Sequence, residues 1–162
     1  MPISKTSLDT INDFLAQKRI ALVGLSRDRG SFSVSVFKEL SKRGYDVVPV
    51  NPNAQELMGR RCYAHLRDIK PPVTAALLLT PPADTETVVR ECAEAGIRRV
   101  WMHRAAGSGA VSQDAVTFCE QHAISLVPGQ CPLMFLPNTA PVHRVHGFIR
   151  KITGRYPKHA HA

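Results

Sequence analysis

The sequence has no run of about 20 apolar residues, which is the length that a helix needs to cross a membrane. Its first 18 residues include two aspartates and lack the apolar centre of a secretion signal. The four cysteines form no CxxC pair, and their spacing fits neither a zinc site nor a disulfide framework. These absences predict reduced thiols and no membrane span, and they favour a cytoplasmic location.

Acidic residues are also missing from one part of the chain, because none follows Glu120. That stretch carries five basic residues, and the net charge of the whole chain is +8. A basic tail attracts the phosphates of a cofactor, a nucleic acid or an anionic membrane surface. Apolar residues at positions 142, 145, 149 and 152 have helical spacing, which predicts a final helix that packs on the domain or on a second subunit. Nucleic acid is therefore the less favoured partner, and a homodimer stays open.

What the sequence does contain is an alternation of short apolar runs with amphipathic segments. Continuous apolar runs are typical of strands buried on both faces of a parallel sheet, and amphipathic segments between them indicate crossover helices. The pattern predicts an α/β fold: a Rossmann-like, doubly wound, mostly parallel five-stranded sheet with flanking helices. We predict strands at 19–26, 46–51, 74–80, 99–103 and 124–127, and helices at 6–18, 33–43, 84–95 and 112–122.

Some details of this pattern are less regular. Pro49 lies within the second strand, and because proline cannot donate to a ladder we expect an irregular strand end or a position near the sheet edge. Residues 52–72 are loop-rich, with one weak helical turn near Leu66. Thr6 is the expected cap of the first helix. We assign residues 1–140 to the sheet domain and residues 141–162 to the basic C-terminal helix and tail.

The turn after the first strand is a candidate phosphate-binding loop. Ligands of doubly wound sheets lie outside the carboxyl ends of the strands, where a helix N-terminus offers unpaired N–H groups to phosphate. Gly24 allows close backbone approach, and Arg27 adds positive charge. Ser26 and Ser31 add hydroxyl donors. The alternative interpretation is an ordinary turn with solvated arginines.

This turn lacks several known motifs. The GxGxxG spacing is broken, no Gly-Lys-Ser/Thr follows as in a P-loop, and the glycine that completes GxSxG is absent. The second strand ends in Asn51, where NAD-binding domains usually have Asp or Glu, so NAD is disfavoured. Asn51 and Pro52 would border the adenosine end of a nucleotide, although a simple turn explains them equally well. Arg27 and Arg29 can accept a 2′-phosphate, which keeps an NADP-binding oxidoreductase or redox-sensing protein open as the alternative.

The ends of the third and fourth strands supply further candidates. Thr80, Pro81 and Pro82 form a rigid apolar wall that suits a long, thin ligand arm. The alternative is that the two prolines only start a helix. His103 ends the fourth strand on the same side of the sheet and is a candidate for cofactor contact.

The remaining histidine and cysteine patterns are weaker. His143 and His146 have HxxH spacing in the expected last helix, but no third or fourth ligand joins them, so we predict no metal site. Cys131 follows the fifth strand. A buried structural cysteine is favoured there over a thiol that a helix N-terminus activates.

Five segments carry a resemblance, in chain order VGLSRDRGSF, VVPVNPNAQELMGRRCYAHLRDI, LLLTPP, EAGIRRVWMH and a Gly-Gln-Cys-Pro element. Over residues 11–131 the chain resembles the stand-alone CoA-binding domain family, which is similar to the N-terminal domain of the succinyl-CoA synthetase alpha subunit. The resemblance implies a Rossmann-like fold that holds coenzyme A across the strand ends. It places Gly24, Ser26 and Arg27 at the phosphates, Asn51 at the adenosine part, and Thr80, Pro81, Pro82 and His103 beside the pantetheine arm.

We therefore expect the chain to bind coenzyme A or an acyl-CoA at the carboxyl ends of the parallel strands, without catalysis of its own. The sequence has no ATP-grasp segment and no second domain like the one that carries the phosphorylated histidine in the synthetase alpha subunit. This favours a binding protein over an enzyme. The expected partners are the small-molecule cofactor and either a second copy of the chain or an acyl-CoA enzyme.

Overall fold

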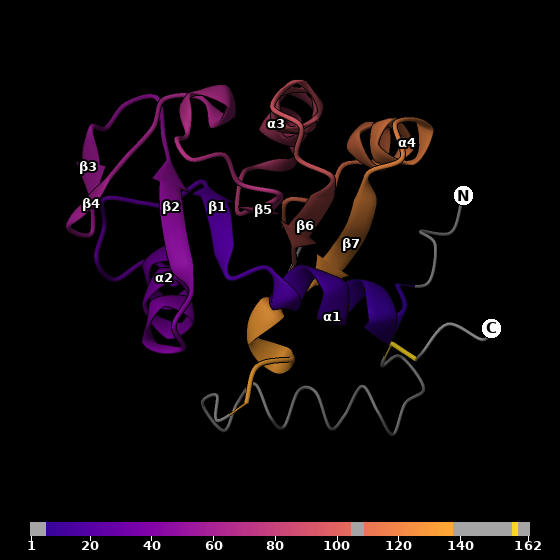
Figure 1. Ribbon diagram of the computed structural model, residues 1–162, viewed down its shortest axis with the longest axis horizontal. Coiled ribbons are helices and arrows are strands. Elements are labelled where there is room, and N and C mark those ends of the chain that lie inside the picture. Colours follow the sequence, from indigo (N-terminus) through magenta and orange to yellow (C-terminus); the bar gives the residue numbers. More distant parts are fainter. Residues whose placement is uncertain (1–5, 105–108, 138–156, 159–162) are drawn as a thin grey trace.

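The computed structural model describes residues 6–104, 109–137 and 157–158 (Figure 1). The helices are α1 (Leu8–Ala16), α2 (Phe32–Lys42), α3 (Pro82–Glu94) and α4 (Gln113–Gln121), with the 3-10 turns η1 (Leu66–Asp68) and η2 (Pro132–Met134). The strands are β1 (Arg19–Val23), β2 (Asp46–Val50), β3 (Glu56–Leu57), β4 (Arg60–Arg61), β5 (Ala75–Leu78), β6 (Arg99–His103) and β7 (Ser125–Gln130). None of these described helices is both long and apolar enough to span a bilayer. The helix predicted over 142–152, with His143 and His146, lies outside the described residues.

Five strands form one parallel sheet in the order β2-β1-β5-β6-β7. The chain runs from β1 outward to β2 and then returns to β5, on the other side of β1. This reversal creates a topological switch point between the carboxyl ends of β1 and β5, where doubly wound sheets bind their ligands. The predicted fold class is confirmed.

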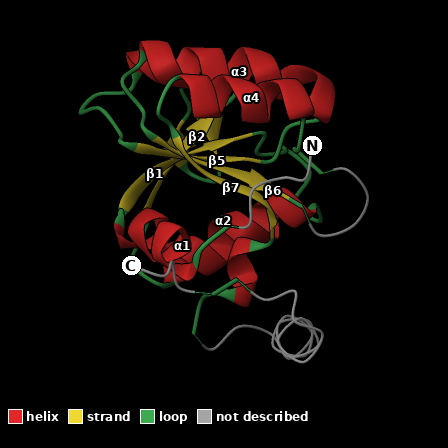
Figure 2. Cartoon of the chain, turned by 90° about the vertical axis from the view of Figure 1, so that its right-hand side faces the viewer, coloured by secondary structure: helices red, strands yellow, loops and turns green. Residues whose placement is uncertain are grey.

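Helices cover both faces of the sheet, with α1 and α2 on one face and α3 and α4 on the other (Figure 2). Successive side chains of a strand therefore enter two different apolar cores. In β1, Ile20 and Leu22 belong to the core under α1 and α2. Ala21 and Val23 belong to the core under α3 and α4. Because both faces are buried, each strand needs apolar side chains at nearly every position, which explains the continuous apolar runs.

β2 is an edge strand, as Pro49 predicts. The Pro49 carbonyl accepts a hydrogen bond from the N–H of Tyr63 at 3.0 Å, and the N–H of Asn51 donates to the Tyr63 carbonyl at 2.9 Å. The segment after β2 thus folds back along the outer edge of the sheet. It contains the predicted helical turn at Leu66–Asp68 and also the β3–β4 hairpin, which was not predicted because strands of two residues carry no readable alternation.

The start of α1 differs from the prediction. Ser7, not Thr6, is the N-cap, and its Oγ accepts a hydrogen bond from the N–H of Thr10 at 3.1 Å. The N-cap is the residue directly before the first helical residue, which is Leu8, so Thr6 is one residue too early for this helix. The N–H of Leu8 donates to the backbone carbonyl of Lys158 at 2.7 Å, which fixes residues 157–158 against the helix start.

Candidate functional site

The carboxyl ends of the parallel strands lie at one edge of the sheet, and the predicted site residues follow these ends. Gly24 follows β1, Asn51 follows β2, Thr80 follows β5 by two residues, and His103 ends β6. The turn between β1 and α2 meets the end of β5 at Gly24 and the end of β2 at Leu25, and the first residue of α2, Phe32, packs on His103 at the end of β6. The structure thus gathers these residues at one edge, and their assignment to a ligand stays a prediction.

Internal hydrogen bonds hold the turn between β1 and α2 in shape. The N–H of Asp28 donates to Ser26 Oγ at 3.0 Å, and the N–H of Gly30 donates to Asp28 Oδ1 at 2.9 Å. Ser31 is the N-cap of α2, and its Oγ accepts from the N–H of Val34 at 3.4 Å. The Ser26 hydroxyl oxygen accepts within the turn, whereas the Ser31 hydroxyl caps α2.

Gly24 is required by a close approach between two strand ends. Its φ is +95°, and a Cβ at this position would lie 2.8 Å from the backbone C and O of Leu79. The N–H of Leu79 donates to the Val23 carbonyl at 2.8 Å, which holds the two segments together. We predicted from the sequence that Gly24 lets the backbone approach a phosphate. In the structure the backbone at Gly24 closely approaches the end of β5.

Asn51 ties the end of β2 to the turn after β1. Its Nδ2 donates to the Leu25 carbonyl at 3.4 Å, and its Oδ1 accepts from the N–H of Asn53 at 2.8 Å. Cys62 Sγ lies 3.6 Å from the Asn51 carbonyl oxygen. Burial raises the pKa of Cys62, and the positive charge of Arg27 is among the smaller effects that oppose this rise. The positive charge of Arg27 therefore acts on the Cys62 thiol.

The two prolines after β5 start α3, in agreement with the alternative interpretation. Pro81 occupies the N-cap position and Pro82 is the first helical residue. Thr80 Oγ1 lies 3.0 Å from Thr85 Oγ1, which lies 3.1 Å from the Pro81 carbonyl oxygen and donates to it. Pro81 is exposed, as is Pro52 after β2. A ligand wall built from these residues stays a prediction.

His103 is almost fully buried at the end of β6, with 8% of its surface exposed. Its ring packs against Phe32, the first residue of α2, with ring centroids 4.7 Å apart. Burial lowers the pKa of His103 to about 4, so the imidazole is uncharged at neutral pH. Its Nε2 is buried and has no hydrogen-bond partner among the described residues.

Gln130 is a residue of this edge that is not among the predicted site residues. β7 extends to this residue, which is paired in register with His103. The predicted strand ended at residue 127, because Pro128 and Gly129 are usual stop signals. The available signal was a long polar side chain directly after those two residues, inside the Gly-Gln-Cys-Pro element. Gln130 is 8% exposed, and its Oε1 has no hydrogen-bond partner in the described part of the chain.

Cys131 is 2% exposed. Burial raises the pKa of its thiol, and this effect exceeds the lowering by hydrogen bonds from the backbone of Leu133 and Met134. A thiol with a raised pKa is a poor nucleophile. The geometry agrees with the buried structural cysteine that the sequence favours.

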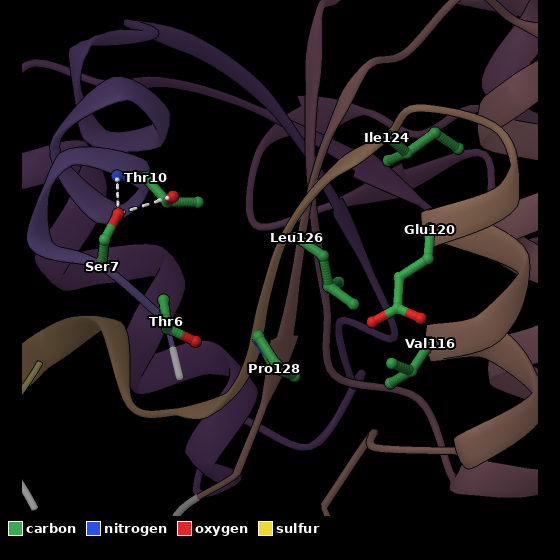
Figure 3. Close-up of a pocket in the computed structure, with 8 residues that line it drawn as sticks. All are labelled: Thr6, Ser7, Thr10, Val116, Glu120, Ile124, Leu126 and Pro128. Atoms are coloured by element: carbon green, nitrogen blue, oxygen red, sulfur yellow. Dashed lines mark hydrogen bonds between the residues drawn. The ribbon is translucent and has the colours of Figure 1, made fainter. Parts of the chain in front are cut away.

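A pocket of about 210 Å³ lies elsewhere, at the β7 edge of the sheet between α1 and α4 (Figure 3). Hydroxyl groups at the start of α1, Glu120 of α4 and apolar side chains of β7 line it. None of the predicted site residues contributes to this lining. Because β7 is the edge strand far from β1, this pocket is separate from the switch point between β1 and β5.

Comparison with known sequences identifies relatives of the whole sheet domain. Residues 18–137 match the family described as CoA binding domain. The ADP-forming acetate–CoA ligase II of Archaeoglobus fulgidus is 30% identical over 94 residues, which cover 57% of this chain and 14% of the ligase. The uncharacterized protein YneT of Bacillus subtilis is 27% identical over 114 residues, which cover 70% of this chain and 82% of YneT.

A solved structure shares the fold of this chain. A hypothetical protein from Pyrococcus horikoshii OT3 aligns with a TM-score of 0.74 at 29% identity, over 82% of this chain and 91% of that protein. The match to three ADP-forming acetate–CoA ligases spans between 12% and 19% of their lengths. Because the family match runs from residue 18 to residue 137, the chain belongs to the CoA-binding domain family.

Proposed function

We propose that this chain binds coenzyme A or an acyl-CoA across the carboxyl ends of its parallel strands, without a catalytic step of its own. The observation that carries the proposal is that the turn after β1 contacts the ends of β2 and β5 at the switch point of the sheet, while the start of α2 contacts the end of β6. Membership of the CoA-binding domain family selects coenzyme A among the nucleotides that such an edge can bind.

The proposed orientation follows the order of the strands. Asn51 and Pro52, after β2, would border the adenosine. Arg27 acts electrostatically on Cys62, whose thiol contacts the Asn51 carbonyl, so its charge would meet the 3′-phosphate on the ribose of coenzyme A. The turn from Gly24 to Ser31 and the start of α2 would bind the diphosphate, because a helix N-terminus favours anions. The pantetheine arm would then pass Thr80, Pro81 and Pro82 and reach His103.

Binding without catalysis is supported by the chemistry of the groups at this edge. His103 is held uncharged by burial, and the Cys131 thiol is buried with a raised pKa. We propose that residues 1–140 form the binding unit, with residues 141–162 as a basic segment beside it. An acyl-CoA enzyme or a second copy of the chain would be the partner that uses the bound cofactor.

Calorimetric titration with coenzyme A, acetyl-CoA, NAD and NADP tests the proposal. Coenzyme A and acetyl-CoA are expected to bind more tightly than either dinucleotide. Failure of coenzyme A to bind at about millimolar concentration, equivalent to about 4 kcal/mol, would contradict the proposal. Tighter binding of NADP would favour the alternative of an NADP-binding protein, since Arg27 can also meet a 2′-phosphate.

Arg27→Ala is expected to weaken coenzyme A binding about tenfold, or about 1.4 kcal/mol, because it removes the charge beside the ribose phosphate. The same variant should bind dephospho-coenzyme A as well as the wild type does. Arg29→Ala, a change to an exposed arginine of the same turn, is the matched control and should have a smaller effect. An equal loss for both ligands would show that Arg27 does not contact the 3′-phosphate.

A further inference from the structure

Two buried polar atoms lie at the carboxyl ends of β6 and β7 without a hydrogen-bond partner among the described residues. They are Nε2 of His103 and Oε1 of Gln130, and each of these residues is 8% exposed. Buried polar groups are hydrogen-bonded in the large majority of cases, because an unpaired group loses its bonds to water without replacement. Two such atoms on neighbouring strands indicate a place where a ligand supplies the partners.

The two side chains lie on the same face of the sheet. His103 follows Trp101 by two residues in β6, and Trp101 belongs to the core under α1 and α2, so His103 points to that face as well. A β-bulge then sets the position of Gln130. Met102 pairs with Pro128 and His103 pairs with Gln130, so Gly129 has no partner on β6. Bulges often redirect a side chain next to a functional site, and this one places Gln130 beside His103.

The backbone at Gln130 is fixed. Its carbonyl accepts hydrogen bonds from Trp101 Nε1 at 2.9 Å and from the N–H of Arg104 at 3.2 Å. Trp101 is itself fully buried between the rings of Phe14 and Phe135, with centroids 5.3 Å and 5.9 Å away. The main chain at Gln130 is therefore held in place before any ligand arrives.

A partly exposed aromatic side chain borders His103. Phe32, whose ring packs on His103, is 38% exposed, although large apolar side chains are normally buried. Phe32 is the first residue of α2 and directly follows Ser31, so it connects this location to the turn after β1. The exposed face of its ring can contact an apolar part of the same ligand.

The location corresponds to the far end of the proposed ligand. With the adenosine at β2, the diphosphate at β1 and the pantetheine arm at β5, the next strands in the sheet are β6 and β7. The group at the end of the arm, which is the thiol or the acyl group attached to it, would therefore lie at His103 and Gln130.

We infer that His103 and Gln130 form a subsite for an acyl group that carries an uncharged hydrogen-bond donor, such as the hydroxyl of a hydroxyacyl-CoA. This inference rests on the proposed function. Gln130 Oε1 can only accept, so it requires an O–H or N–H from the ligand. A neutral imidazole can either donate or accept at Nε2, which lets His103 take the hydroxyl oxygen or the thioester carbonyl.

A carboxylate is a poorer match for these two side chains. Oε1, the buried atom of the Gln130 side chain that lacks a partner among the described residues, would repel it, and His103 is uncharged at neutral pH. A carboxylated acyl group therefore belongs among the probes.

The test compares Kd values for coenzyme A, butyryl-CoA, 3-hydroxybutyryl-CoA and succinyl-CoA by calorimetry. The wild type is expected to bind 3-hydroxybutyryl-CoA about tenfold more tightly than butyryl-CoA, because one added hydroxyl completes hydrogen bonds to buried partners. In Gln130→Leu, which replaces the amide by an apolar side chain of similar size, the two Kd values are expected to become equal. Gln121→Leu, at an exposed position of α4, is the matched control and should retain the preference.

Thermal unfolding without ligand shows whether the variant folds and gives a second readout. Gln130→Leu removes an unpaired buried acceptor, so its Tm should equal or exceed that of the wild type. A lower Tm would show that Gln130 has a structural partner and would contradict the inference.

Other outcomes would also overturn the inference. Equal wild-type Kd values for the butyryl and hydroxybutyryl ligands would exclude recognition of the hydroxyl. An equal loss for all four ligands in Gln130→Leu would assign the Gln130 side chain to the pantetheine arm, and tightest binding of succinyl-CoA would show that the location takes a carboxylate. In each of these cases coenzyme A still binds, whereas absence of all binding would also remove the proposed function.

Discussion

Gly24→Ala is expected to lower the free energy of unfolding by about 3 kcal/mol and to abolish measurable coenzyme A binding. Two costs add at this position. A non-glycine residue at a φ of +95° is strained by roughly 1–2 kcal/mol. The new Cβ would also lie 2.8 Å from the backbone C and O of Leu79, and forcing such an approach costs about 1–3 kcal/mol. Because the clashing atoms of Leu79 belong to the main chain, the clash can be relieved only if the ends of β1 and β5 separate.

Gly44→Ala is the matched control for this change. Gly44 has a φ of +83°, and a Cβ there would meet no atom within 4 Å, so the variant carries the backbone strain without the clash. We expect it to cost about 1 kcal/mol and to leave coenzyme A binding intact. Urea unfolding followed by circular dichroism compares the two variants. Equal losses would show that the approach of β1 to β5 is not what requires glycine at position 24.

Much of the fold could be predicted because the determining signals are local. The apolar runs of the five strands are continuous, and Pro49 marks β2 as an edge strand. The prediction of 99–103 coincides with β6. Errors occur where the same local residues are compatible with two different structures. The pair Pro128 and Gly129 normally ends a strand, but Gly129, with a φ of +72°, here lies within a bulge and β7 continues to Gln130.

The candidate site was only partly readable from the sequence for a different reason. Residues directly after parallel strands must share one edge of the sheet, which identifies Asn51, Thr80 and His103 without knowledge of any contact. The contacts themselves join segments that are far apart in the sequence. The packing of Phe32 on His103 is one of these, and the pairing of His103 with Gln130 is another. The first contact depends on the strand order, and the second depends on the strand order and the bulge. Neither feature could be predicted from a local pattern in the sequence.

Lowering the pH is expected to destabilise the protein through His103. Its pKa is about 4 in the folded protein, against an ordinary value of 6.5. Between these values the unfolded chain binds a proton that the folded protein does not, so the free energy of unfolding falls as the pH falls. The contribution is fully present above pH 6.5 and is lost by about pH 4, and the total loss is about 3 kcal/mol. About 2 kcal/mol of it should appear between pH 7.5 and pH 5, before most carboxyl groups titrate.

Urea unfolding at several pH values, for the wild type and for His103→Phe, isolates this contribution. Phenylalanine keeps a ring against Phe32 but cannot bind a proton, so the variant should lose about 2 kcal/mol less than the wild type over the same pH interval. If the wild type and His103→Phe have the same pH dependence, the His103 imidazole is solvated. It would then be free to carry charge, and a carboxylated acyl group would no longer be disfavoured at the end of β6.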